Sequence, residues 1–415
     1  MFRPPELCGG AECAERRQSH HPMTRAAFST PAGAADTGPL PAEDRFTCLP
    51  GCGLCCSYRV LVTEAELQRL QSARAFPGAA QPSDATADGR WALLRGSSGS
   101  ASGFCLFLDA LQRCTVYEDR PGQCRTYPYL WVAYSRLELD VDLSCPGLGR
   151  GDVARGERRQ PPAESPASQA RREQSIRQVQ SLLRAQQLYA APEKLVALGE
   201  RFVDDMAVGW PSATILVNRV RPMFVNGQVK EGHAVPQGEL SLFSQPMIEP
   251  QDVRSVPASA ALMERHFSRP QWNTHLAPDG RVTVYRFWIA DNILYLEDRD
   301  GTQQTLPLGD AAQLPWQPEA LATRRAYLRR WLKRQLPVRL ANNMALASLA
   351  HRSHVATCYL QFLTEIDWRL AVLAPALARA CGQAEVGRAV VLEAVRGSDA
   401  LLRSWCESAR VGVTG

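Results

Sequence analysis

The stretch Phe46–Cys56 reads FTCLPGCGLCC and gathers cysteines on one short turn: Cys48, Cys52, Cys55 and Cys56. Thiolates this close in sequence reach a common metal at little loop-closure cost. Gly51 and Gly53 permit backbone angles that let amide groups point at thiolates or at the sulfur of a cluster. The stretch therefore predicts a metal-binding loop whose bound metal staples the region around it.

A second group of cysteines follows at wider spacing: Cys105, Cys114, Cys124 and Cys145. Four plus four thiols fit two four-thiolate sites, or one site with spare thiols. The adjacent Cys55 and Cys56 would face opposite sides of an extended chain. They would then serve different metals, or only one of them would be a ligand.

Iron–sulfur is the favoured cofactor, as one or two [4Fe-4S] clusters, and zinc is the alternative. Zinc also takes four-cysteine sites and stabilises loop-rich modules. The two widely separated CxxC pairs of a zinc ribbon do not occur in this sequence, which weakens the zinc interpretation but leaves it open. The concentration of cysteines in so short a stretch argues against a set of merely buried thiols.

The chain has 415 residues, 45% of them hydrophobic and 21% charged, which indicates a globular protein of two or three domains. Its formal net charge of +5 is weak for this length, so we expect no nucleic-acid binding. Without an apolar signal-peptide core or a run of ~18 apolar residues, we expect a cytoplasmic protein with no transmembrane segment. Clustered cysteines in that reducing compartment favour metal ligation. Neither the oligomeric state nor translation of the residues before Met23 follows from the sequence.

Three segments in order resemble the YkgJ-type cysteine-cluster family, which is described as a zinc- or iron-chelating domain. They read FTCLPGCGLCC, FCLFLDALQRCTVYEDRPGQCRTYP and LSCPGLGRG. The first gap is one residue longer here than in the family's CxxCxxCC-like motif, which leaves the role of Cys48 less defined. The resemblance covers residues 46–149. It implies a set of metal ligands: Cys48, Cys52, Cys55, Cys56, Cys105, Cys114, Cys124 and Cys145.

Arg120 and Arg125 match the RPxxCRxxP element of the same family. A [4Fe-4S] cluster on four thiolates is a net dianion when oxidised, and two nearby guanidinium groups would offset that charge and raise the reduction potential. The alternative is that both arginines make ordinary loop hydrogen bonds. Either interpretation places them outside the set of direct ligands.

The function predicted first is that of an iron–sulfur protein whose cluster moves electrons or organises a site acting on a partner protein. A more distant resemblance to the flagellin lysine-N-methylase group implies a protein-modifying transferase that binds S-adenosylmethionine. The cysteine spacing of that group differs, so the activity is not transferred. A non-enzymatic zinc module used for interaction is the third possibility. The sequence does not decide whether the protein is an enzyme.

The expected fold class is α+β, a small loop-rich cysteine-cluster module followed by a mainly helical domain with a short antiparallel sheet. We predict a disordered tail over 1–45, the metal-binding domain over 46–149, a linker over 150–165 and the C-terminal domain over 166–415. The tail and linker are rich in small, polar and proline residues.

Local patterns predict several elements. Thr63 and Glu66 form a capping box at the start of a helix. Alternation predicts a strand over Leu137–Leu143 and a hairpin of Val282–Ala290 with Ile293–Glu297. Helical spacing predicts helices over Ser168–Tyr189, Glu319–Leu336, Val338–Leu363, Ile366–Ala380 and Glu385–Ser408.

Residues 324–334 are rich in arginine. Two interpretations of this segment are open: a solvated helix face, or a surface that binds an acidic partner, nucleic acid or an anionic membrane.

Overall fold

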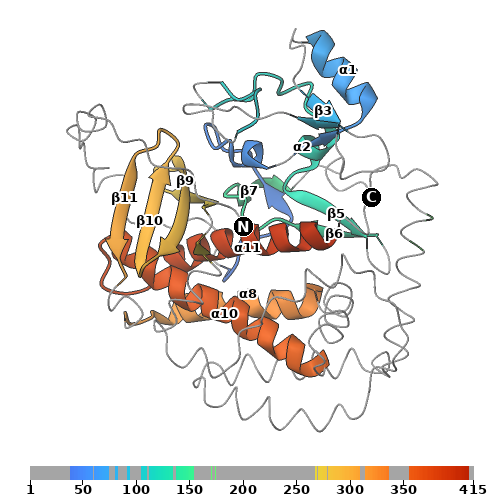
Figure 1. Ribbon diagram of the computed structural model, residues 1–415. Coiled ribbons are helices and arrows are strands. Elements are labelled where there is room, and N and C mark those ends of the chain that lie inside the picture. The colour runs from blue at the N-terminus through green and yellow to red at the C-terminus, as the bar shows by residue number, and fades with distance from the viewer. Residues whose placement is uncertain are drawn as a thin grey trace, which may run out of the picture.

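The structure is a computed structural model in which small antiparallel sheets and long helices share one chain. The predicted α+β class is confirmed (Figure 1). The described residues are 38–58, 60–73, 80–82, 91–93, 104–109, 112–133, 137–153, 170, 173, 267–268, 270–277, 279–308, 314–335 and 355–410.

The cysteine-rich region contains short elements joined by loops. Two-stranded sheets pair β1 with β7 and β5 with β6, and a three-stranded sheet has the order β2-β4-β3. Their bounds are β1 Arg45–Phe46, β2 Leu61–Val62, β3 Ala80–Pro82, β4 Trp91–Leu93, β5 Tyr129–Ala133, β6 Leu137–Val141 and β7 Leu148–Val153. The helical elements are η4 Leu54–Ser57, α1 Glu64–Ala73 and α2 Gly122–Thr126. The strand predicted over Leu137–Leu143 is therefore confirmed in β6.

The capping box at the start of α1 is confirmed. The Thr63 backbone N–H donates to Glu66 Oε2 at 2.9 Å, and the Glu66 N–H donates back to Thr63 Oγ1 at 3.3 Å. The other carboxylate oxygen, Oε1, accepts the N–H of Gly122 at 2.7 Å. Glu66 therefore both starts α1 and holds the start of α2, which carries Cys124.

A four-stranded antiparallel sheet with the order β11-β10-β9-β8 lies in the C-terminal region. Its strands are β8 Gln271–Leu276, β9 Val282–Ala290, β10 Ile293–Asp298 and β11 Gln303–Pro307. The predicted hairpin is confirmed, because β9 pairs with β10 across Asp291 and Asn292. Both turn residues have positive φ, 49° and 60°, as a two-residue turn between twisted strands requires.

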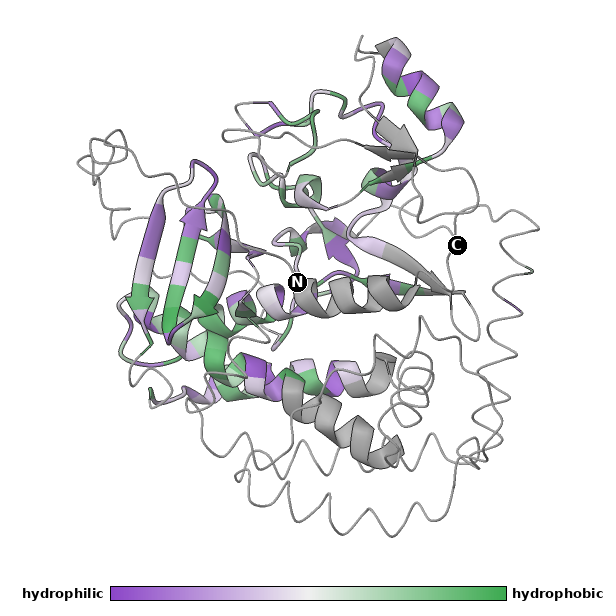
Figure 2. Cartoon of the chain, in the orientation of Figure 1, coloured by the Kyte–Doolittle hydropathy of each residue, from purple (hydrophilic) through white to green (hydrophobic). Residues whose placement is uncertain are grey.

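Long helices pack against this sheet and against one another. They are α8 Pro318–Gln335, α10 Val355–Ala380 and α11 Arg388–Arg410. In Figure 2 the ends of β10 and β11 that lie next to α10 are green and their far ends are purple. The apolar ends of the strands thus meet the helices, and the polar ends face away from them.

The predicted helix boundaries are right for α8 and for most of α11, but wrong around Leu363. α10 runs through Thr364 and Glu365, where a break was predicted, and it also contains Pro375. Neither residue of that pair stops a helix, and Ile366 is fully buried immediately afterwards. Burial of Ile366 in the core therefore keeps α10 continuous through Thr364 and Glu365. Residues 336–354 and most of the predicted helix Ser168–Tyr189 lie outside the described residues.

One hydrophobic core joins the cysteine-rich region to the C-terminal region. Tyr129, Leu143 and Cys145 pack in the same cluster as residues of the sheet and of the long helices. Polar contacts reinforce this junction. Asp399 of α11 accepts the Leu143 N–H at 2.9 Å, and Arg330 of α8 donates to the Val141 carbonyl at 2.8 Å. Strands β5–β7 are therefore built into the larger core.

The segment just before the first cysteines is bound to α8 and α11. Glu43 pairs with Arg330 at 2.7 Å, and the Gly38 carbonyl accepts a hydrogen bond from Arg388. These contacts fall within the end of the predicted tail, and β7 extends to Val153, into the predicted linker. The proposed division of the chain into domains stays a prediction.

A buried polar network ties α11 to the sheet. Tyr285 donates to Glu393 Oε1 at 2.6 Å, and His275 Nδ1 lies 2.8 Å from Glu393 Oε2. Asn273 donates to the Tyr285 hydroxyl at 2.9 Å. Burial raises the pKa of Tyr285 well above its usual value, and the Glu393 charge adds to this effect. These groups satisfy one another inside the core.

None of the helices that the structure describes is both long enough and apolar enough to span a membrane.

Candidate metal centre

The ends of the cysteine-rich segment are brought together by the pairing of β1 with β7. Phe46 is in register with Leu148, and the Thr47 N–H donates to the Gly147 carbonyl at 3.0 Å. A side chain at Gly147 would collide with the carbonyl oxygen of Thr47, so a glycine is needed for this close approach. Cys48 thus leaves the sheet beside the strand that follows Cys145.

Cys55 and Cys56 lie on η4, and not on an extended segment as expected. Gly53 precedes this 3-10 helix with φ 57°, and the Cys56 N–H donates to its carbonyl at 3.0 Å. Successive side chains on a 3-10 helix do not alternate between two faces. The thiols of Cys55 and Cys56 are instead hydrogen-bonded to each other. The expectation that they face opposite sides is therefore wrong.

The second group of cysteines is folded back onto the first. The Cys105 N–H donates to the Cys56 carbonyl at 2.8 Å, which joins the two groups directly. The chain then turns back on itself, with a bridge between Leu108 and Cys114. Cys124 lies on α2, whose start is held by Glu66.

Most of the cysteines are partly shielded from solvent. Cys48 is exposed and Cys145 is buried, with an exposed fraction of 7%. Cys105, Cys114 and Cys124 pack against a small apolar cluster of α1, β2 and nearby loops. All eight candidate ligands are free thiols, so none of them is used in a disulfide.

The cysteines influence one another electrostatically. A hydrogen bond from Cys56 lowers the pKa of Cys55, against burial and with help from the Arg120 charge. Burial is the main cause that raises the pKa of Cys52, to about 12, and of Cys114, Cys124 and Cys145, whereas the pKa of Cys56 is raised first by its hydrogen bond with Cys55 and then by burial. The negative charge of Cys55 adds to each of these shifts: Cys52, Cys56, Cys114, Cys124 and Cys145. The charge of Cys55 is therefore a shared cause of all five raised pKa values.

The remaining cysteines belong to the same group. The charge of Cys48 raises the pKa of Cys52 and Cys114, and that of Cys105 raises the pKa of Cys56 and Cys124. Every predicted ligand is therefore within electrostatic range of at least one other. These contacts leave the eight-cysteine ligand set a prediction. Cys381 does not belong to the group, since its thiol is affected by burial and by Glu393.

Arg120 acts electrostatically on several of the thiols, whereas Arg125 is exposed on the last turn of α2. The charge of Arg120 lowers the pKa of Cys55, Cys114 and Cys124. Its Nε donates to the Tyr117 carbonyl at 2.8 Å, and its guanidinium lies 3.6 Å from the centre of the Tyr117 ring. Arg120 thus makes a loop hydrogen bond and also places positive charge near the thiols.

A third arginine reaches the cysteines from the C-terminal region and was missed by the sequence analysis. Arg299 lies in the turn between β10 and β11, and its Nη2 donates to the carbonyl of Cys52. The charges of three thiolates act on its guanidinium: Cys52, Cys56 and Cys55. The local sequence around Arg299 is that of an ordinary turn, so no motif marks this role.

The chemistry of these side chains fits a thiophilic metal. Thiolates are ligands for zinc and for iron–sulfur clusters, and the nearby guanidinium groups offset their negative charge. Within the described residues, no three or more His, Cys, Asp or Glu side chains are close enough to one another to hold a metal ion. The assignment of each cysteine as a ligand therefore stays a prediction.

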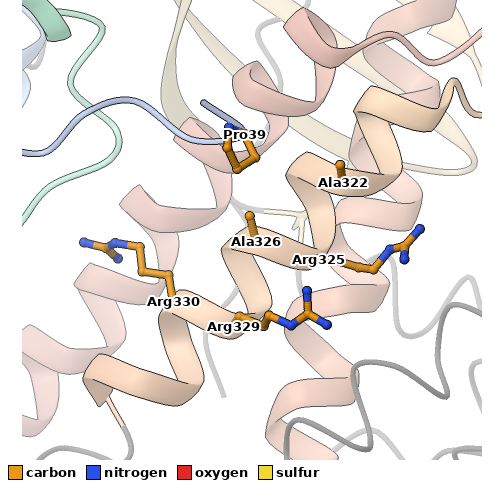
Figure 3. A pocket seen from close by; sticks show the side chains of 6 residues that line it. All are labelled: Pro39, Ala322, Arg325, Ala326, Arg329 and Arg330. Carbon is orange, nitrogen blue, oxygen red and sulfur yellow. The ribbon is translucent and has the colours of Figure 1, made fainter. Parts of the chain in front are cut away.

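A cavity elsewhere in the molecule contains none of these thiols. It has a volume of about 490 Å³ and lies between Pro39 and α8 (Figure 3). Arg330 points away from Arg325 and Arg329 in this view and pairs with Glu43 and Asp140. The basic stretch is therefore partly turned into the protein, and only part of it matches a solvated helix face.

Taken together, the clustered thiols and their cationic neighbours define a cysteine-rich metal-chelating region. In the comparison with family models, residues 47–146 match the model CxxCxxCC, which is described as a "putative zinc- or iron-chelating domain". The match includes every predicted cysteine ligand and confirms the resemblance seen in the sequence. Neither the curated proteins nor the solved structures gave a significant match.

Metal binding is the level of function that this match supports. It covers zinc and iron without choosing between them. The lysine-N-methylase resemblance and S-adenosylmethionine binding are not supported by it and stay predictions.

Proposed function

We propose that the protein is a cytoplasmic iron–sulfur protein that holds one or two [4Fe-4S] clusters on its eight clustered cysteines. The observation that carries this proposal is the presence of eight cysteines between residues 48 and 145, whose two groups are joined by the hydrogen bond from the Cys105 N–H to the Cys56 carbonyl. A single zinc ion takes four protein ligands, which is half of the set. More than one metal ion is therefore needed to use these thiols, and a cluster supplies several ions at one place.

The charges around the thiols also support a cluster. Arg120 lies within the cysteine-rich region and Arg299 in the C-terminal sheet, and both act electrostatically on the thiols. A cluster on four thiolates is anionic, and cationic neighbours favour its reduced state by offsetting the added electron. Redox chemistry is accordingly the proposed use of the cluster, either as electron transfer or in a reaction on a protein partner.

The first test is elemental analysis with an absorption spectrum, on full-length protein purified without oxygen. We expect about four or eight iron atoms per chain with matching acid-labile sulfide, and a broad visible band that bleaches on reduction. Stoichiometric zinc without sulfide would overturn the proposal. It would make the region a structural zinc module, the alternative that the family description also covers.

The number of clusters is tested by single substitutions in different parts of the group. The charge of Cys52 raises the pKa of Cys145, and that of Cys105 raises the pKa of Cys124. With two clusters, Cys52→Ala and Cys124→Ala should each remove about half of the iron, and the double variant nearly all of it. With one cluster, each single substitution should remove most of the iron. Cys381→Ala is the matched control and should retain all of it.

A further inference from the structure

The turn between β10 and β11 inserts a cationic side chain into the loop that carries Cys52. The Nη2 of Arg299 donates to the Cys52 carbonyl, and its guanidinium carbon lies 4.5 Å from the centre of the Phe104 ring. Phe104 in turn contacts Trp272 of β8, with 4.4 Å between ring centres. The C-terminal sheet and the cysteine loop therefore meet at Arg299.

Two of the hydrogen-bond donors of Arg299 are buried and unused. Its Nε and Nη1 have no hydrogen-bond partner among the residues that the structure describes. A buried donor without an acceptor costs about 1–3 kcal/mol, and more when the group is charged. Among the described residues, the acceptor found for this guanidinium is one backbone carbonyl. Burial lowers the pKa of Arg299, and the negative charges of the nearby cysteines oppose this effect.

The cysteine loop is shaped to admit this guanidinium. A methyl group at Gly53 would lie 3.0 Å from Nη2 and 3.3 Å from Nη1 of Arg299. Gly53 also has φ 57°, which a side chain disfavours. The glycine before η4 thus allows both the turn of the loop and the approach of Arg299 from the sheet.

We propose that Arg299 is a positioning residue of the metal centre, whose free N–H groups donate to the sulfur atoms of the metal-loaded site. The acceptors are the metal-bound thiolates of the Cys52–Cys56 loop or the sulfide of a cluster. This inference rests on the proposed function, because it requires that these cysteines hold a metal. Sulfur that carries negative charge on a metal is the acceptor that the buried donors lack.

This contact couples the metal centre to the C-terminal sheet. If Arg299 binds the loaded site more strongly than the empty one, metal loading must tighten the β10–β11 turn against the cysteine loop. By linkage, loss of Arg299 must weaken metal binding by the same factor. The C-terminal region thereby senses whether the cysteines are loaded.

The test compares Arg299→Gln and Arg299→Lys with the wild-type protein, all in the full chain. Arg281→Gln is the matched control, since Arg281 lies in the β8–β9 turn of the same sheet, is exposed and pairs with Asp279 at 2.5 Å. We expect Arg299→Gln to bind metal about 10-fold more weakly, measured by competition with a chelator. Arg299→Lys should retain part of the affinity, because it keeps the charge but loses the planar pair of donors.

A second readout separates this role from a merely structural one. In the iron-loaded protein, Arg299→Gln should lower the reduction potential, and Arg299→Lys should restore most of it. Hydrogen exchange in the β10–β11 turn of the wild-type protein should slow on metal loading, which is measurable even if Arg299→Gln fails to fold. The Arg281→Gln variant should match the wild-type protein in potential and affinity.

The outcomes distinguish the two proposals. A wild-type chain that holds neither iron nor zinc overturns the proposed function and this inference with it. Wild-type metal binding, together with equal affinity and equal potential in Arg299→Gln and Arg281→Gln, overturns the role of Arg299 alone. Unchanged exchange in the β10–β11 turn on metal loading would likewise remove the coupling and leave the metal centre intact.

Discussion

The cysteine-rich region and the C-terminal region differ in what fills their interiors. The C-terminal core is a continuous apolar cluster that contains residues such as Tyr285, Leu294 and Leu373, all fully buried. Around the cysteines the apolar cluster is small, and Cys105, Cys114 and Cys124 lie at its edge. Burial of apolar area can stabilise the first region by itself. The second has thiols where a larger domain has aliphatic side chains, so we expect its stability to depend on metal bound by those thiols.

The boundary between these two modes of stabilisation runs inside the cysteine-rich region. Strands β5 to β7 contribute Tyr129, Val141 and Leu148 to the large core. The loop of Cys52 to Cys56, with α1 and α2, forms the separate small clusters. Metal should therefore matter most between residues 52 and 124, and least for the strands around Cys145.

Removal of a thiol from the centre of the group should have the largest effect. We expect Cys55→Ala and Cys124→Ala each to lose about half or more of the bound metal and to yield poorly soluble protein, because structural metal supplies folding free energy. Metal content and the soluble fraction after expression measure this. Cys381→Ala, outside the group, should change neither quantity.

Full metal retention in Cys55→Ala would contradict the assigned ligand set, or would show that Cys56 replaces its neighbour on η4. The double variant Cys55→Ala/Cys56→Ala separates these two explanations. If it too retains all of the metal, neither residue is a ligand.

Truncation of a core side chain in α10 should lower the stability of the protein but leave its metal content unchanged. Leu373 is fully buried in the large core, and Leu373→Ala should lower the free energy of unfolding by about 2–5 kcal/mol. The metal content of each folded chain should stay near the wild-type value, because Cys145 is the one candidate ligand found in this core cluster among the described residues, and Cys52, Cys56, Cys105, Cys114 and Cys124 lie at the smaller clusters. Chemical denaturation with metal analysis of the folded fraction measures both. Leu106→Ala, at a position 37% exposed, is the control and should change stability little. Loss of metal in Leu373→Ala would show that the two regions fold as one unit.

Local patterns predicted much of the fold because local physics decides those elements. The capping box of α1 and the Asp291–Asn292 hairpin need only neighbouring residues, and both are confirmed. The break predicted near Leu363 is wrong, since burial of Ile366 by distant helices continues α10 through it. Likewise, the extended segment expected at Cys55 is wrong, since this residue lies on η4. Gly53 and its contacts with distant residues determine the turn there.

The residues of the candidate site also differ in whether the sequence alone reveals them. Eight cysteines within a hundred residues could be recognised as one group because their spacing and side-chain chemistry are visible in the sequence. Arg299 could not be recognised, since it lies 247 positions from Cys52 and its turn carries no motif. Only the packing of the sheet on the cysteine loop brings it there.

The two glycines of the cysteine loop offer a smaller and sharper comparison. Gly51 and Gly53 have φ of 70° and 57°, so an alanine at either position costs about 1–2 kcal/mol of backbone strain. Open space surrounds a methyl group at Gly51, whereas one at Gly53 presses on Arg299 and Leu108. We expect Gly53→Ala to weaken metal binding severalfold more than Gly51→Ala, measured by chelator competition. Equal losses in the two variants would mean that the approach of Arg299 does not affect the metal.

The smallest expected effect lies at Glu66, which joins α1 to α2 without touching a cysteine. Burial raises the pKa of Glu66, but the hydrogen bonds from Gly122 and Thr63 outweigh it and lower the pKa below the usual value. A carboxylate with a lowered folded pKa stabilises the protein above the unfolded pKa, and this contribution disappears as the pH falls through the folded pKa. Glu66→Gln should therefore cost about 0.5–2 kcal/mol near neutral pH.

Denaturation of both proteins across an acidic pH series measures this contribution. The difference between wild type and Glu66→Gln should shrink toward zero as the wild-type carboxylate becomes protonated. Acid also protonates metal-bound thiolates and so weakens metal binding, but it does so in both proteins, and the difference therefore isolates Glu66. Glu64→Gln, which removes the same charge from the same turn of α1, should show no such pH-dependent loss. A difference that persists in acid would mean that Glu66 acts through packing and not through its charged hydrogen bonds to Gly122 and Thr63.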